Sequence, residues 1–288
     1  MPGTVEIDVL LERFPDRTRE AFDHIWTENA RRNSALTETG RFQGLHDRCD
    51  GRPCFLVGAG PSLVGNVSGL KDALARLADC KPVVVAVDRA YPFLRGNGIV
   101  PTFVVSIDGG EEAVRFFQGW DTGGTVLVAN ASCHPDVPPM FEKRTFVVPD
   151  GDYMSDCESA KVTLGLFPGD ARISAAGLVG AWSLVVADWI GCDPLIFLGY
   201  DCSVAKGHGL GYEHIDLASA VPLALIALRR WLTDVGIPSI SARRPGTRVW
   251  NCTEGGILAK GCEVFPLEEA VSRLTNATDG IVVERNMS

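Results

Sequence analysis

A histidine in a glycine-flanked loop has the residue type and setting for acid–base chemistry. His208 stands between Gly207 and Gly209, shortly after Asp201. An imidazole titrates near neutral pH, so His208 can take a proton from an acceptor hydroxyl or assist a departing phosphate. Asp201 can orient that imidazole or bind a ribose hydroxyl; alternatively, it caps the following loop. We predict that His208 and Asp201 are catalytic; a loop histidine without function is the alternative.

A second candidate is a small-residue turn after the apolar run 55–57. The turn contains Gly58, Gly60, Pro61 and Ser62, and a helix-like segment follows. Glycine lets a ligand approach the main chain, and amides at a helix N-terminus attract phosphates. We predict that Gly60, Pro61 and Ser62 hold nucleotide phosphates through backbone amides and the Ser62 hydroxyl. A valine at position 60 should then block the nucleotide and leave the fold intact. The alternative is a tight turn that binds nothing.

Polar residues follow several other apolar runs. Asp88, Asp108 and Asn130 each end a run of this kind, so a parallel sheet would bring them to one edge with the glycine turn. We predict that they bind the nucleotide. Asp108 has an alternative role as a helix N-cap, because Gly109 and Gly110 follow it.

Further residues are expected to contact the substrate. We predict this role for Tyr200, Asn251, Thr253 and Glu254. Glu254 has the alternative of ending a strand in a tight turn. Other candidates are weaker. Arg243 and Arg244 could bind an anionic sugar or phosphate, or form an exposed solvated pair. His134 and His214 have a turn role or a structural role as alternatives, and Cys192, Cys202 and Cys252 are expected to be apolar fillers.

The elements that position these residues alternate regularly. Continuous apolar runs with helix-like segments between them predict an α/β fold: a Rossmann-like, mostly parallel sheet with helices on both faces. The expected strands are 55–57, 83–87, 103–107, 126–129, 146–148, 195–198, 238–240 and 248–250, and the expected helices are 70–77, 90–95, 114–118, 174–190 and 218–235. Residues 151–170 are polar and irregular, and whether 151–173 form a lid stays open.

The first fifty residues differ from the rest. They are rich in charge and carry apolar residues at spacings that fit one or two amphipathic helices, which Pro15 interrupts. We therefore predict an N-terminal helical segment, 1–50, and a Rossmann-like domain, 51–288.

Composition excludes several classes of protein. The 288 residues are 46% hydrophobic and 22% charged, typical of a globular protein. The formal net charge of -9 argues against a nucleic-acid partner. The sequence shows neither a ~20-residue apolar run nor a secretory signal, so we expect no membrane span. Nine scattered cysteines without CxxC spacing predict reduced thiols and a cytoplasmic location.

Five motifs in order resemble one family. They are GAGPSL at 58–63, SID at 106–108, IGCDPLIFLGYD at 190–201, GHG at 207–209 and NCTEGG at 251–256. Together they resemble the family that joins bacterial motility accessory factors, which are flagellin glycosyltransferases, with archaeal 6-hydroxymethylpterin diphosphokinase. The resemblance covers roughly residues 54–267.

That resemblance implies a Rossmann-like fold related to the bacterial sialyltransferases, so we expect residues 51–288 to form a Rossmann-like nucleotide-dependent transferase domain. It also implies one of two reactions: transfer of a nonulosonic acid sugar from a CMP-linked donor to a hydroxyl, or of diphosphate from ATP to a pterin alcohol. We favour glycosyl transfer, because the later motifs look like the motility-factor branch and the acidic DxD-type cluster is absent. The expected partners are a nucleotide-sugar or ATP as co-substrate, no permanently bound cofactor, and a protein or glycan acceptor. A magnesium requirement and the oligomeric state stay open, as do a non-catalytic nucleotide-binding module and a dehydrogenase-like protein.

Overall fold

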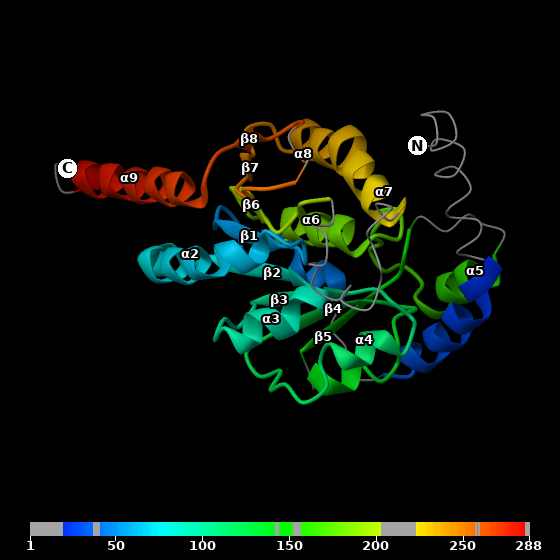
Figure 1. The fold of residues 1–288 in the computed structure, drawn as a ribbon. Helices are drawn as coiled ribbons and strands as arrows, with labels where there is room; N and C mark the ends of the chain where they lie inside the picture. The colour runs from blue at the N-terminus through cyan, green and yellow to red at the C-terminus, as the bar shows by residue number, and fades with distance from the viewer. Residues whose placement is uncertain are drawn as a thin grey trace, which may run out of the picture.

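The strands form one parallel sheet in the computed structural model, which describes residues 20–36, 41–141, 144–151, 157–202, 223–256, 258 and 260–285. The eight strands lie in the order β5-β4-β3-β2-β1-β6-β7-β8, and every pair is parallel (Figure 1). Their bounds are β1 Cys54–Val57, β2 Val83–Val87, β3 Phe103–Ser106, β4 Val126–Asn130, β5 Thr145–Val148, β6 Leu195–Leu198, β7 Val249–Asn251 and β8 Glu263–Val264. The predicted α/β fold is confirmed.

Helices cover both faces of the sheet (Figure 1). The central strands are apolar and buried at successive positions, so alternate side chains enter two separate cores. One core holds α6 Val179–Trp189, α8 Ile237–Arg243 and residues 42–49; the other holds α2 Leu63–Arg76, α3 Tyr91–Gly96 and the first turns of α9 Leu267–Arg285. Because Phe42 and Leu45 share a core with the sheet, the N-terminal segment packs on it directly. The domain division at residue 50 stays a prediction.

Several predicted elements were wrong in type or extent. Residues 238–240 were expected as a strand, but they lie within α8, which follows α7 Leu223–Trp231 through a π-helical turn at Leu232–Gly236. Helix α6 begins at Val179 rather than at residue 174. The stretch 151–170, expected to be irregular, contains α5 Glu158–Leu166. Helix α2 begins at Leu63, seven residues before the predicted start at 70, and α4 is confined to Glu112–Arg115.

The strand order reverses next to β1. β2 follows β1 in the chain and pairs with one of its edges, whereas β6, much later in the chain, pairs with the other. Crossovers therefore leave β1 and β6 toward opposite sides. This is a topological switch point, and in open parallel sheets ligands bind outside the carboxyl ends of the strands there.

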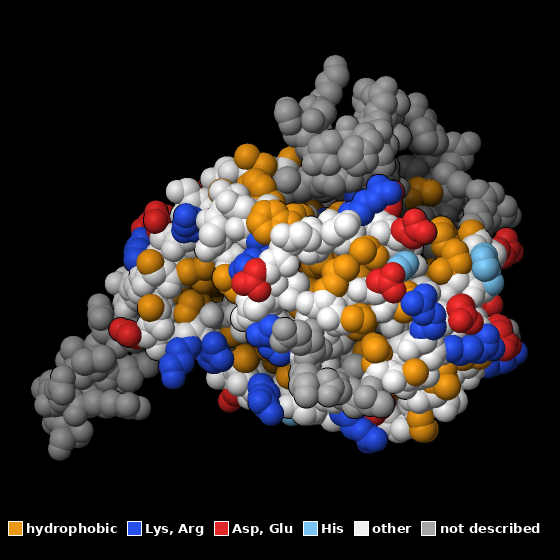
Figure 2. Space-filling view, turned by 90° about the horizontal axis from the view of Figure 1, so that it is seen from below, with side chains coloured by type: hydrophobic (Ala, Val, Ile, Leu, Met, Phe, Trp, Pro, Cys, Tyr) orange, Lys and Arg blue, Asp and Glu red, His pale blue; other side chains and the backbone are white. Residues whose placement is uncertain are grey.

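Charge is mixed over the described surface. In the face shown in Figure 2, basic and acidic side chains are interspersed. None of the helices in the described part of the chain has both the length and the apolar character needed to cross a bilayer.

Candidate nucleotide and substrate site

A pocket lies at the switch point. Its walls come from the turn after β1 (58–61), the end of β2 (87 and 89), the start of α6 (179 and 180), the turn after β6 (199, 200 and 202) and one face of α7 (225 and 228). Its empty volume is about 620 Å³, part of it open to solvent. The walls are mostly apolar, and Arg89 is the charged residue among the described lining residues.

Glycine is required in this pocket because two turns touch. A Cβ atom on Gly58 would lie 2.5 Å from the Gly199 carbonyl oxygen, and one on Gly199 would lie 2.6 Å from the Gly58 carbonyl oxygen. Gly199 also has a φ of +66°. The β1 and β6 turns can therefore meet only without side chains at these positions.

The hydrogen-bond donors of Gly60 and Ser62, which we predicted to hold a phosphate, already have partners within the protein. The Gly60 N–H donates to the Gly199 carbonyl at 2.8 Å. The Ser62 hydroxyl and N–H donate to Asp201 Oδ2 at 2.8 and 3.3 Å. Pro61 has no N–H. A phosphate seated on these groups would have to displace a carboxylate of the same sign, so the phosphate role of this turn stays a prediction that the geometry does not favour.

Gly60 also contradicts part of our expectation for a valine at that position. A Cβ atom there would overlap Asp201 Oδ2 and lie 2.5 Å from the Gly199 carbonyl oxygen. The substitution would therefore disturb the fold as well as any ligand.

Asp201 caps the N-terminus of α2 through its hydrogen bonds with Ser62. It is 3% exposed, and burial raises the pKa of its carboxyl, while the hydrogen bonds from Ser62 lower it. Gly60, Gly255 and Gly256 all pack so closely around it that a Cβ atom on any of them would press on Asp201. The predicted partner of Asp201 cannot be placed, because His208 lies outside the described residues, as does His214.

Asp88 and Asp108 end neighbouring strands but have different surroundings. Asp88 is buried; its Oδ1 accepts from the Arg89 N–H at 2.8 Å, and its Oδ2 accepts from the Ser106 hydroxyl at 3.1 Å. Burial raises the pKa of Asp88 to about 6. Asp108 is exposed, and its Oδ1 accepts from the Gly110 N–H, as in a capping turn. Asp88 thus faces β3 rather than lining the pocket.

Asn130 belongs to a buried polar cluster farther along the same edge. Its Oδ1 accepts from the Ser132 N–H at 2.7 Å, and its Nδ2 donates to Asp150 Oδ2 at 3.3 Å. Both the carboxylate and the amide are buried. Asn130 therefore stabilises the loop after β4. Two strands, β3 and β2, separate it from the glycine turn after β1.

Sequence reasoning missed two asparagines that hold this edge. Asn29 and Asn33 lie on the helix formed by residues 20–34. The Asn29 amide donates to the carbonyls of Gly109 and Ser132, and the Asn33 amide donates to those of Ala131 and Cys133. Their spacing of four places them on one helix face, and two amides on a face that packs inward are the signal that could have revealed them.

The predicted substrate residues mainly hold their own loops. The buried Tyr200 hydroxyl bonds Ser183 and the Gly180 carbonyl, and burial raises its pKa, although its ring lines the pocket. Asn251 accepts from the Thr253 N–H, and Thr253 Oγ1 accepts from the Tyr200 N–H. Glu254 has a φ of +58° and accepts from the Leu267 N–H at the start of α9, in line with its alternative turn role.

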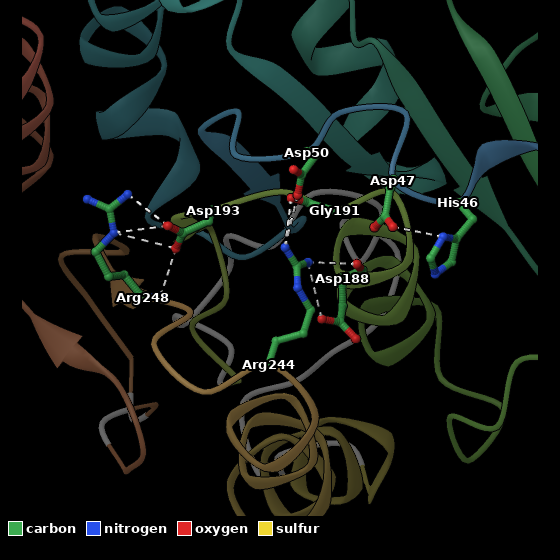
Figure 3. A network of polar contacts seen from close by, with 8 residues as sticks. All are labelled: His46, Asp47, Asp50, Asp188, Gly191, Asp193, Arg244 and Arg248. Carbon is green, nitrogen blue, oxygen red and sulfur yellow. Dashed lines mark hydrogen bonds and ion pairs between the residues drawn. The ribbon is translucent and has the colours of Figure 1, made fainter. Parts of the chain in front are cut away.

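The remaining candidates are structural. Arg243 and Arg244 both pair with Asp188 at the end of α6, and neither is a lining residue of the pocket. Arg244 lies near the amino ends of the strands (Figure 3), and the Arg243 side chain is exposed. His134 Nδ1 accepts from the Asp136 N–H within a turn. Cys192, Cys202 and Cys252 are buried, and each has a raised pKa, to about 12 for Cys202 and Cys252, as expected for inert fillers. Among the described residues, no three His, Cys, Asp or Glu side chains gather as metal ligands would.

Comparisons with known proteins agree with this fold. Residues 27–207 match the family model described as 6-hydroxymethylpterin diphosphokinase MptE-like. The solved MAf glycosyltransferase from Magnetospirillum magneticum AMB-1 is similar over 88% of this chain and 41% of its own, with a TM-score of 0.62 and 18% identity, a likeness of fold. A comparison with curated proteins found no match. The matched residues 27–207 include the glycine turn and the carboxyl ends of β1 to β6.

Proposed function

Because this chain belongs to the 6-hydroxymethylpterin diphosphokinase MptE-like family, we propose that it is a transferase that uses a nucleotide donor. The family resemblance predicted from the five motifs is confirmed at this level. The observation that carries the proposal is the pocket at the switch point between β1 and β6, the position at which open α/β sheets bind nucleotides.

We further propose glycosyl transfer: a nonulosonic, sialic-acid-like sugar passes from a CMP-linked donor to a hydroxyl of a protein or glycan. The fold of the MAf glycosyltransferase supports this choice, although this chain spans 41% of that protein. His208 is the proposed base that takes the acceptor proton, and Asp201 is proposed to assist it from the turn after β6.

The alternative is transfer of diphosphate from ATP to a pterin alcohol, which the description of the family favours. Both reactions leave a nucleotide phosphate in the pocket, so they share the donor site. They differ in their products, because glycosyl transfer releases CMP from a CMP-sugar, whereas diphosphate transfer releases AMP from ATP.

The first prediction concerns His208. His208→Ala should lower turnover by ~10²–10⁴-fold, the usual contribution of a general base, and leave donor affinity unchanged. CMP release from a CMP-sugar and AMP release from ATP are measured in parallel, with and without magnesium. His24→Ala, on the exposed side of helix 20–34, serves as the control. Equal rates for the wild type and His208→Ala would remove the histidine from the mechanism.

Binding without turnover would indicate a nucleotide-binding module. A panel of CMP, CDP, UDP, ATP and NAD in a thermal-shift assay separates that outcome from catalysis, because saturation at about a hundred times the dissociation constant adds ~2.7 kcal/mol to the free energy of unfolding. Stabilisation by NAD alone would favour the dehydrogenase-like reading over the proposal.

A further inference from the structure

We propose that Arg89, rather than the Gly60–Ser62 turn, binds the phosphate of the nucleotide donor. This assignment rests on the proposed function. Arg89 is not part of any of the five sequence motifs. With this assignment, the expected ligand of the pocket is a flat aromatic base linked to a phosphate.

The first argument is that the donors of Gly60 and Ser62 are already used. The Gly60 N–H bonds the Gly199 carbonyl, and both donors of Ser62 bond Asp201. Asp201 is nearly inaccessible and wedged between glycines, so a ligand cannot move it without rebuilding two turns. The positive end of α2 therefore already has a carboxylate as its anion.

The second argument is the position of Arg89. It follows β2, whose carboxyl end lies beside that of β1, and it lines the pocket together with residues 58–61. Its guanidinium carbon lies 5.3 Å from the centroid of the Phe116 ring. This distance is typical of a cation–π contact, which holds the charge near the ends of β2 and β3. A guanidinium carries five N–H donors in a planar fork that suits bidentate binding of a phosphate.

The third argument is the chemistry of the other walls. Val179, Leu225 and Leu228 line the pocket together with the Tyr200 ring. These walls suit a flat heterocycle such as a nucleobase and offer little to a polyhydroxylated sugar. The arrangement thus places the base among α6 and α7 side chains and its phosphate toward β2.

The test is calorimetry with the full chain and two matched ligand pairs: CMP with cytidine, and ATP with adenosine. Arg89→Met should weaken CMP and ATP on the order of 10- to 100-fold, the effect of losing a charged hydrogen bond, and leave cytidine and adenosine unchanged. Arg89→Lys keeps the charge but loses the planar fork of donors, so its affinities for CMP and ATP should lie between those of the wild type and Arg89→Met. Arg76→Met is the control, because Arg76 pairs with Glu268 on the surface and does not line the pocket.

The outcomes separate the two proposals. Unchanged CMP and ATP affinities in Arg89→Met would overturn the assignment and leave the proposed function standing. An equal loss for nucleotides and nucleosides would also overturn it, because Arg89 would then shape the pocket without reading phosphate. A wild-type chain that binds neither CMP nor ATP would overturn the proposed function and this assignment together. If Arg89→Met does not fold, Arg89→Gln, which is neutral and planar, takes its place with the same readings.

Discussion

Asp88 shows how burial changes the behaviour of one side chain at the strand ends. It is buried at the end of β2, and its two oxygens accept from Arg89 and Ser106. The nearby charge of Asp108 adds to the effect of burial, and together they raise the pKa of Asp88 to about 6. The folded state therefore holds a proton on Asp88 at a pH where the unfolded chain, with a value near 3.8, has released it.

This difference predicts a pH-dependent loss of stability. Because the folded pKa is raised, the contribution of Asp88 to the free energy of unfolding falls as pH rises from about 4 to about 6, by on the order of 3 kcal/mol. Asp88→Asn keeps an acceptor for the Arg89 N–H and cannot ionise. Urea unfolding should show the variant gaining on the wild type across that window, with little or no advantage at pH 4. A difference that is constant with pH would contradict the raised pKa.

Among the secondary-structure elements, the start of α2 and the turn before it hold two glycines with different surroundings: Gly60 is tightly packed and Gly65 is open to solvent. Gly60 lies against Asp201 and the Gly199 carbonyl, whereas a Cβ atom on Gly65, the third residue of α2, would meet nothing within 4 Å. Gly60→Ala should lower the free energy of unfolding by about 1–3 kcal/mol or more. Gly65→Ala should raise it by about 0.5–1 kcal/mol, because alanine favours the helix.

Thermal and urea unfolding of the two alanine variants measure this pair directly. Equal effects would mean that the close contact between the β1 and β6 turns does not constrain position 60.

Seven of the eight strands could be predicted from the sequence because each is a short, continuous apolar run that ends in a polar or small residue. Strand β8 was missed because its two residues, Glu263 and Val264, are exposed and form no such run. The prediction for residues 238–240 was wrong because a short segment in which Pro238 and Ser239 stand between Ile237 and Ile240 fits a strand as well as a helix, and only packing against α6 decides. The site was harder. Asp88 and Asp201 could be predicted because they follow strands, but their partners Ser106 and Ser62 come from other segments of the chain. No local pattern indicated Arg89 or Asn33.

At the scale of the whole molecule, Arg244 joins three distant segments near the amino ends of the strands, on the side opposite the pocket (Figure 3). It donates to the carbonyls of Asp188 and Gly191 at 3.1 and 3.0 Å, and it pairs with Asp50 in the loop before β1. The end of α8, the end of α6 and the N-terminal segment are thereby held together.

Arg244→Met should lower the free energy of unfolding by about 1–3 kcal/mol, because two backbone carbonyls lose a charged donor. Arg248→Met should lower it by less, about 0–1 kcal/mol, since the Arg248–Asp193 pair is more exposed, with 44% and 25% of the two side chains accessible. Urea unfolding of both variants at one pH tests the order. A larger effect for Arg248→Met would mean that the three segments are held by packing alone.

The position of β6 beside β1 also determines when the sheet can be completed during synthesis of the chain. In the finished sheet β1 is central, yet its β6 edge is bare until residues 195–198 have left the ribosome. At ~5–20 residues per second, that takes roughly 7 to 30 s after β1 itself has been made. Throughout that interval an apolar strand has an open side, a template on which another nascent chain could add, and α2 lacks the carboxylate that caps it. The same delay keeps the pocket from forming, so a half-made chain cannot sequester the nucleotide that the finished protein is proposed to use.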